Sequence, residues 1–274
     1  RMNRLDKLDK GTYSTLIGYT TRLKLVNDFF NNKPWINLTK KNIEKVYNDL
    51  EDGVIKNKFG NKYKDRDSFY NKVMRSNPFK LAGKDELARE VMEFHAKPRD
   101  EEVRFFEEDT FMQMVSVVKN TVHELLFWLQ WDIGENINTT LDLRQKHFHR
   151  QINKQGEAEY RVFLPRPSLK LSRQQRGEIT NYKRTTELLD IVLKGRSDNE
   201  RIFSFSYNMA NKILARILKI IKVKCQLGQK ITWKDFRSSM ACYLLANDWN
   251  TDEVKKRLGH KPSSSVIDKY VNYH

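Results

Sequence analysis

The stretch ITWKDFRSSMACYLLANDWNTDEVKKRLGHKPSSSVIDKYVNYH, residues Ile231–His274, contains the features that decide the fold. Thr232 and Asp235 have the spacing of a capping box, which predicts that a helix begins just after Thr232. Lys234 and Arg237 are three residues apart, so both cationic side chains leave the first turn on one face. The apolar residues of the opposite face mark its buried side: Phe236, Met240, Tyr243 and Leu244.

Two shorter helices are expected in the rest of this stretch. Thr251 is the predicted N-cap of the first, and Gly259 is the residue type that ends a helix in a left-handed turn. His260 is therefore held in a tight turn. Pro262 and the serines that follow it begin a last short helix, which carries Tyr270. The stretch thus brings one Arg, one Lys, one His and one Tyr into a single region.

The order and spacing of these residues resemble the C-terminal half of the catalytic domain of tyrosine recombinases, the phage-integrase family. Members of that family carry a His-x-x-Arg or Lys-x-x-Arg box at the start of a helix, then a Leu-Gly-His turn and, shortly after it, a nucleophilic tyrosine. The matching residues here are the Lys234–Arg237 box, the turn Leu258-Gly259-His260, and Tyr270. The Lys-x-x-Arg box looks most like that of archaeal chromosomal or mobile-element integrases.

The resemblance implies that Tyr270 attacks a DNA phosphate, with Tyr273 as the alternative nucleophile. A Tyr hydroxyl has an unperturbed pKa near ~10, so the attack needs neighbours that accept its proton and neutralise phosphate charge. Arg237 can bind two phosphate oxygens, and His260 can donate or accept a proton at neutral pH. Lys234 stands where many members have His. Exchanging a phosphodiester for a phosphotyrosyl ester is nearly even in energy, so no cofactor or metal is expected.

Composition and charge favour a nucleic-acid partner. The 51 Lys and Arg residues outnumber the 35 Asp and Glu residues, which gives a net charge of +16 and points to double-stranded DNA. No apolar run approaches the roughly 18 residues of a membrane helix, so no membrane association is expected. The cysteines and histidines do not have the spacing of a metal site. These features predict a cytoplasmic, nucleoid-associated protein.

Residues 1–95 are expected to form a helical domain. Apolar residues recur at helical spacing over residues 13–30, Thr39 is the predicted N-cap of a second helix, and two short helices follow between residues 69 and 94. In the resemblance this is the SAM-like core-binding domain that clamps DNA. Residues 96–108 contain a Pro and a cluster of charges and are the expected linker. Residues 109–274 are then the recombinase catalytic domain.

The first half of that catalytic domain predicts one long helix and one β-hairpin. A regular apolar stripe indicates a single helix from Asp109 through Leu129. Residues 147–152 and 160–164 alternate in polarity on either side of a Gly-containing turn, which predicts the hairpin. The expected fold is therefore mainly α with a small antiparallel β element. The family carries a Lys in this hairpin region that protonates the leaving 5′ oxygen, and Lys170 matches it best, ahead of Lys154.

One position departs from the family pattern. Members place a catalytic Arg two residues after a Gly that is matched here by Gly134, and this chain has Asn136 there. An amide carries no positive charge, and loss of such a group commonly costs about 10²–10³ in rate. Three explanations stay open: another arginine, such as Arg144, Arg173 or Arg176, takes its place from a different backbone position, the site works with Asn, or the protein binds DNA without cleaving it. The candidate DNA-binding residues are Asn136, Arg144, Arg173 and Arg176.

The resemblance implies a site-specific DNA recombinase or integrase that works through a 3′-phosphotyrosyl intermediate. Such enzymes act as tetramers on synapsed DNA, so this chain is expected to be a monomer when free and a homotetramer on DNA. A DNA-binding protein with impaired cleavage on the same scaffold is the alternative, motivated by Asn136. A basic helical RNA-binding or ribosome-associated protein is the third hypothesis, and it predicts that Tyr270→Phe leaves any cleavage assay unchanged.

Overall fold

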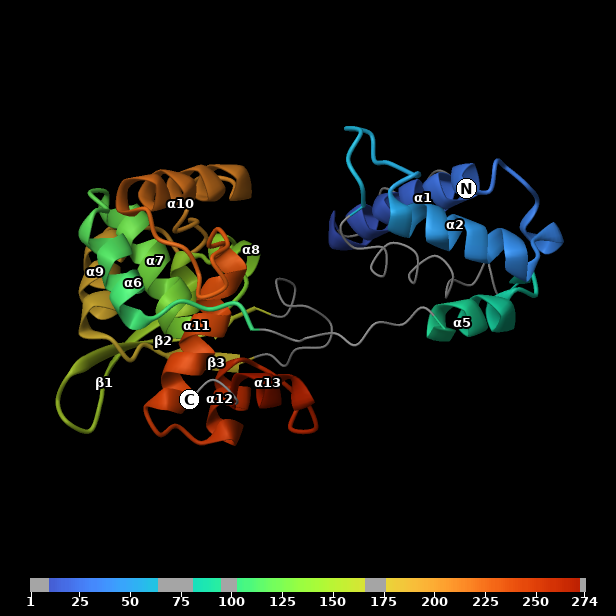
Figure 1. Ribbon diagram of the computed structural model, residues 1–274. Helices are drawn as coiled ribbons and strands as arrows, with labels where there is room; N and C mark the ends of the chain where they lie inside the picture. Colours follow the sequence, from blue (N-terminus) through green and yellow to red (C-terminus); the bar gives the residue numbers. More distant parts are fainter. Residues whose placement is uncertain (1–9, 64–80, 95–102, 166–175, 272–274) are drawn as a thin grey trace. The chain divides into compact units, whose positions relative to one another are not determined.

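The chain forms two compact units, Arg1–Arg99 and Asp100–His274, in the computed structural model (Figure 1). The structure describes residues 10–63, 81–94, 103–165 and 176–271. Separate clusters of buried apolar side chains lie in the two units. Within the described ranges, no helix has both the length and the apolar character needed to cross a membrane.

The first unit is helical. Its described elements are α1 (Lys10–Phe29), η2 (Trp35–Asn37), α2 (Lys40–Asp52) and α5 (Asp85–Phe94). The helices expected over residues 13–30 and after Thr39 are confirmed. Thr39 begins α2 through a capping box, in which its hydroxyl accepts from Asn42 N and the Asn42 side chain accepts from Thr39 N. The helix expected between residues 69 and 74 lies outside the described residues.

The second unit is mostly helical with one small sheet, which confirms the expected fold class. Its elements are α6 (Glu108–Ser116), α7 (Thr121–Ile133), α8 (Ile137–Leu141), η3 (Gln145–His147), β1 (Phe148–Ile152), β2 (Ala158–Leu164), β3 (Arg176–Ile179), α9 (Lys183–Leu193), α10 (Tyr207–Ile221), α11 (Trp233–Ala246), α12 (Thr251–Arg257), η5 (Ser265–Ile267) and α13 (Asp268–Val271).

The sheet is antiparallel with strand order β1-β2-β3. The predicted hairpin is confirmed as β1 and β2, in which Phe148 pairs with Val162. β3 was not expected from the sequence; it pairs with β2 so that Val162 lies opposite Glu178. This strand is four residues long, and its most buried residue, Glu178, is charged. β3 therefore lacks the alternation of apolar and polar residues by which a strand is predicted from a sequence.

The single helix expected from Asp109 through Leu129 is wrong, because two helices occupy that range. α6 ends at Ser116, and the side chain of Asn120 then caps α7 by accepting a hydrogen bond from His123 N at 3.0 Å. An N-cap side chain satisfies a backbone donor that a new helix leaves unpaired. The chain therefore restarts at Asn120 although the apolar periodicity continues through it.

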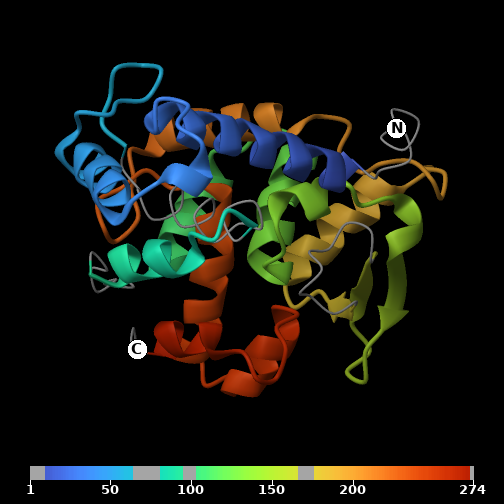
Figure 2. The same ribbon diagram turned by 90° about the vertical axis from the view of Figure 1, so that its right-hand side faces the viewer.

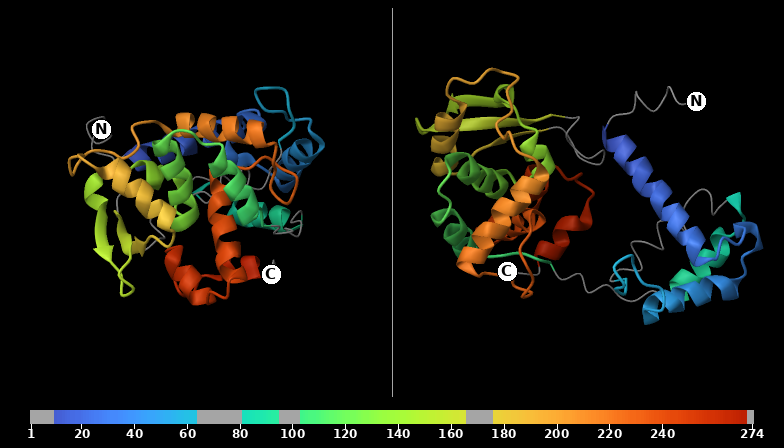
Figure 3. Two further views of the ribbon diagram at one scale, coloured as in Figure 1. Left: turned by 90° about the vertical axis from the view of Figure 1, so that its left-hand side faces the viewer. Right: turned by 90° about the horizontal axis from the view of Figure 1, so that it is seen from above.

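α7 is the central helix of the second unit. Every residue from Leu125 to Ile133 is buried, and the helix packs on α9 and α11. Phe111 of α6 stacks on Trp131 with ring centroids 4.6 Å apart. α11 extends from the side of α10 to α12 and α13 (Figures 2 and 3). One end of α11 thus meets the segments that carry the candidate catalytic residues.

Residues 103–107, which fall in the expected linker 96–108, belong to the second unit and pack against the rest of it. Val103, Phe105 and Phe106 are buried. Phe106 N donates to Ser239 Oγ of α11 at 2.8 Å. The part of the expected linker that precedes residue 103 lies outside the described residues.

Candidate active site

The first turn of α11 is held in place by its cap. Thr232 N donates to Asp235 Oδ2 at 2.7 Å and the Thr232 hydroxyl donates to the same oxygen at 3.0 Å, which confirms the predicted capping box. Asp235 also forms a part-buried ion pair with Arg104, at 2.9 Å. Lys234 is exposed in this turn. The cap fixes the start of the helix, and with it the position of Arg237 one turn later.

Arg237 joins two distant loops. Its Nη1 donates to the carbonyl of Gly134 and its Nη2 to the carbonyl of Leu258, both at 2.5 Å, and Nη2 also lies 3.0 Å from His260 Nε2. The side chain is buried, with the residue 8% exposed. The expectation that Arg237 lies away from the buried side of α11 is therefore wrong, because these two loops cover that face.

The turn that carries His260 ends α12. Gly259 has a φ of +64°, Gly259 N donates to Lys256 O at 2.8 Å, and His260 N donates to Lys255 O at 2.9 Å. This is the pattern of a Schellman motif, as Gly259 predicted. The N-cap of α12 is Asn250, one residue before the predicted Thr251; its side chain accepts from Asp252 N at 2.8 Å.

Tyr270 lies in α13 and is buried, with 6% exposure. It belongs to the apolar cluster that contains Met240 and Leu258, and α13 packs on α11. Lys269 lies over its ring, 5.6 Å from the centroid. The tyrosine is thus close in the fold to the helix of Arg237 and to the turn of His260.

Asn136 follows a buried acidic residue. It is the N-cap of α8 and is partly buried, and its backbone N donates to Glu135 Oε1 at 2.7 Å. Glu135 is 1% exposed and pairs with Arg176, whose Nη1 lies 2.9 Å from Glu135 Oε2. Arg176 Nε lies 2.8 Å from Glu178 Oε1. The structure therefore brings the guanidinium of Arg176 to the residue next to Asn136.

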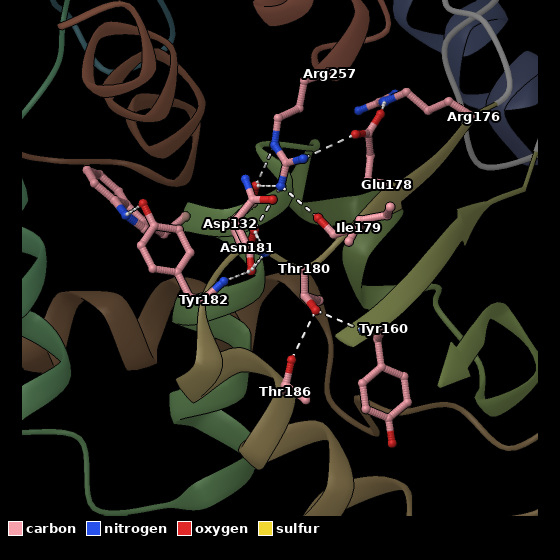
Figure 4. A network of polar contacts seen from close by, with 11 residues as sticks. Asp132, Tyr160, Arg176, Glu178, Ile179, Thr180, Asn181, Tyr182, Thr186 and Arg257 are labelled. Carbon is pink, nitrogen blue, oxygen red and sulfur yellow. Dashed lines mark hydrogen bonds and ion pairs between the residues drawn. The ribbon is translucent and has the colours of Figure 1, made fainter. Parts of the chain in front are cut away.

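A buried ionic network lies beside this pair (Figure 4). Arg257 of α12 donates to Asp132 O at 2.7 Å, to Asp132 Oδ1 at 2.8 Å and to Ile179 O at 3.0 Å, and its Nη1 lies 3.4 Å from Glu178 Oε2. Burial raises the pKa of both carboxyl groups, and the charge of Arg257 opposes that shift. The network ties the end of α7 to β3 and α12, and Arg237 contacts the residues that directly follow α7 and α12.

The other candidate residues are placed less centrally or fall outside the described residues. Arg144 donates from Nη1 to the carbonyl of Asn199, and its backbone pairs with Arg201. Lys154 is exposed in the hairpin turn. Lys170, Arg173 and Tyr273 lie outside the described residues. In the part of the chain that the structure describes, no group of three or more His, Cys, Asp or Glu residues has a metal-binding arrangement.

Comparison with known proteins identifies the fold. No protein-family model matches the sequence, and no curated protein sequence matches it either. A lambda integrase dimer bound to a COC′ core site is similar at a TM-score of 0.67 and 14% identity, over 96% of this chain and 72% of that chain. The Tn1549 transposon integrase in complex with a circular intermediate DNA is similar at a TM-score of 0.60 and 14% identity, over 100% of this chain and 93% of that chain.

A lambda integrase tetramer bound to a Holliday junction has a TM-score of 0.59 and 14% identity, over 98% of this chain and 75% of that chain. At these identities the likeness concerns the fold. The fold of this chain matches the catalytic-domain fold of tyrosine recombinases.

Proposed function

We propose that this chain is a DNA strand transferase of the tyrosine-recombinase type, which cleaves and rejoins DNA in site-specific recombination or integration. The observation that carries the proposal is the contact between Arg237 and His260, which are 23 residues apart and meet through Arg237 Nη2 and His260 Nε2. A guanidinium and an imidazole held together in this way form a suitable binding site for a phosphodiester. The net charge of +16 favours the same polyanionic substrate.

In the proposed reaction the phenolic oxygen of Tyr270 attacks the scissile phosphorus. A bond forms between that oxygen and phosphorus while the bond from phosphorus to the 5′ oxygen breaks, leaving a 3′-phosphotyrosyl ester. Arg237 binds the non-bridging oxygens, on which negative charge builds up. His260 accepts the phenol proton, Lys234 adds positive charge, and Lys170 donates a proton to the leaving 5′ oxygen. Attack by a second strand's 5′ hydroxyl reverses these steps and joins the DNA.

The burial of Tyr270 gives the proposal a conformational step. A ring that is 6% exposed must leave its apolar cluster, at least in part, to reach a phosphate. α13 spans only Asp268–Val271 and follows the single-turn helix η5, so a small number of backbone contacts hold it. Movement of α13 on DNA binding then exposes the nucleophile only where DNA is present.

The same proposal extends to the assembly and the setting. Residues 1–95 form a core-binding domain that clamps DNA, residues 109–274 form the catalytic domain, and residues 96–108 link them. The free protein is a monomer, and four copies act on two synapsed duplexes. The chain acts on chromosomal DNA in the nucleoid, in the service of a mobile element of the archaeal integrase type. Analytical ultracentrifugation of the protein with and without DNA tests the change in assembly.

A second candidate function is favoured by Asn136. An amide at this position adds no positive charge, so the chain is then a DNA-binding protein on the same scaffold that does not cleave. This alternative predicts that the protein binds DNA but forms no covalent protein–DNA product.

Covalent capture separates the two. Wild-type protein is incubated with a library of nicked duplexes of random sequence, in which a nick beside the scissile phosphate traps the covalent product. Denaturing gel electrophoresis then detects protein–DNA adducts. The strand transferase predicts an adduct for the wild type and for Tyr207→Phe, a change at an exposed tyrosine of α10, and none for Tyr270→Phe. Library binding by the wild type without any adduct supports the non-cleaving alternative and contradicts the enzyme.

A further inference from the structure

Arg176 is held unusually close to the turn that carries His260. It begins β3, and its side chain is only 9% exposed. A Cβ added to Gly259 would lie 2.5 Å from Arg176 Nη1 and 3.1 Å from its Cζ. The guanidinium therefore packs directly against the backbone of Gly259, in space that any other residue at that position would occupy.

The guanidinium groups of Arg176 and Arg237 contact the same two segments. Arg237 donates to Gly134 and Leu258, and Arg176 pairs with Glu135 and packs on Gly259. Gly134 and Glu135 are the two residues that follow α7, and Leu258 and Gly259 are the two that follow α12. Each arginine contacts one residue of each pair. Arg237 reaches them from α11 and Arg176 from β3, so two cationic groups converge on one place from different elements.

The nitrogens of Arg176 differ in their partners. Nη1 forms an ion pair with Glu135 at 2.9 Å and Nε forms one with Glu178 at 2.8 Å, although neither contact has hydrogen-bond geometry. Among the described residues Nη2 has no hydrogen-bond partner, although it is buried. A buried donor without an acceptor is costly, and a guanidinium donor is best satisfied by an anionic oxygen. The two glutamates fix the orientation of the group and leave Nη2 available.

We propose that Arg176 is the second guanidinium on the scissile phosphate, and that it supplies from β3 the positive charge that Asn136 does not. This inference rests on the proposed function and names a further catalytic residue for it. A phosphate bound to Arg237 beside the Leu258–His260 turn presents its remaining oxygens to Arg176. Glu135 and Glu178 act as positioning residues, because each holds a different nitrogen of Arg176.

Rescue of a disabled variant is the decisive test. Arg176→Gln is expected to lower the rate of adduct formation with the nicked library by about 10²–10³, as loss of one charge-stabilising donor does. Asn136→Arg in the Arg176→Gln background restores a guanidinium from the neighbouring backbone position and is expected to raise the rate at least about tenfold. A purely structural role for Arg176 predicts no such rescue. Arg150→Gln, which removes the same charge from β1, is expected to stay within about twofold.

The possible failures are distinguishable. An unchanged rate in Arg176→Gln, or a loss that Asn136→Arg does not restore, overturns the proposal. If Arg176→Gln does not fold, because Glu135 loses its partner, the double variant Glu135→Gln/Arg176→Gln takes its place in the same comparison. If the wild type forms no adduct, the proposed function fails, and a crystal structure in sulfate decides: a sulfate that contacts both Arg237 and Arg176 supports the paired site, and one that contacts Arg237 without Arg176 contradicts it.

Discussion

The Nη2 atom of Arg237 lies 3.0 Å from Nε2 of His260, and the same nitrogen donates to the carbonyl of Leu258. A guanidinium can only donate, so Nε2 of His260 accepts in this contact. His260 therefore helps to hold Arg237 in place together with the carbonyls of Gly134 and Leu258.

Arg237→Lys is expected to abolish most activity while it keeps the charge. A lysine ammonium cannot donate to Gly134, Leu258 and His260 in the fixed planar geometry of a guanidinium. We expect the rate of adduct formation to fall by about 10²–10³. The free energy of unfolding should fall by about 1–3 kcal/mol, because buried carbonyl groups lose their donors. Adduct assays and urea unfolding measure the two effects, and an active Arg237→Lys protein would contradict the role of the planar group.

Arg257→Leu is expected to lower the free energy of unfolding by about 3–5 kcal/mol, because it leaves the buried carboxylate of Asp132 without its countercharge. Asp132 is 1% exposed and lies 2.8 Å from Arg257. Arg201→Leu is the matched control, since Arg201 pairs with Asp142 at the same 2.8 Å but both side chains are about half exposed. That change should cost no more than about 1 kcal/mol. Urea unfolding followed by tryptophan fluorescence compares them, and equal costs would argue against the buried network.

Gly259→Ala should cost more than Gly195→Ala. Both glycines have a positive φ, +64° and +76°, so alanine at either position pays the left-handed penalty of about 1–2 kcal/mol. A Cβ at Gly195 would meet nothing within 4 Å among the described residues, whereas one at Gly259 would lie 2.5 Å from Arg176 Nη1. We expect Gly259→Ala to lose at least about 1 kcal/mol more, because Arg176 must leave Glu135. Equal losses in thermal unfolding would show that Arg176 is not packed on this turn.

Acidification should destabilise the second unit in part through His147. Its Nδ1 accepts from Arg144 N at 3.1 Å, and burial together with the charges of Lys146 and Arg144 lowers its pKa from 6.5. The unfolded chain then binds the proton more readily, so stability is present above pH ~6.5 and is lost as the pH falls toward the lowered folded pKa. A shift of one pKa unit corresponds to ~1.4 kcal/mol, and the effect here should be a fraction of that value because the ring is only partly buried.

His147→Asn keeps an acceptor for Arg144 N but does not titrate. Unfolding measured between pH 5 and 8 should therefore show a smaller slope for the variant than for the wild type. An identical slope would exclude His147 as a contributor.

Much of the fold is predictable from local signals. The capping boxes at Thr39 and Thr232, the turn at Gly259 and the hairpin of β1 and β2 all depend on residues a few positions apart. The break at Asn120 had its own local signal, an Asn with an acidic residue in the turn that follows, but the apolar stripe outweighed it. β3 carried no such signal, because a charged residue, Glu178, takes its buried position.

The site was predictable only as a set of residue types. The sequence indicated Arg237 and His260 by spacing, but their contact arises from tertiary structure. Arg176 was one of several arginines with equal claims to replace the missing charge. Its partners Glu135 and Glu178 are buried acids, and their burial depends on Arg176 and Arg257, which no sequence periodicity reveals.

Mass spectrometry of the covalent adduct tests the central claim most directly. Wild-type protein is trapped on the nicked library and digested with protease and nuclease, and the peptide that retains a nucleotide is sequenced. We expect a single modified residue, Tyr270, joined through a 3′-phosphate. A nucleotide on Tyr273 or on any other residue, a 5′-phosphate linkage, or the absence of an adduct from protein that binds the library would contradict it.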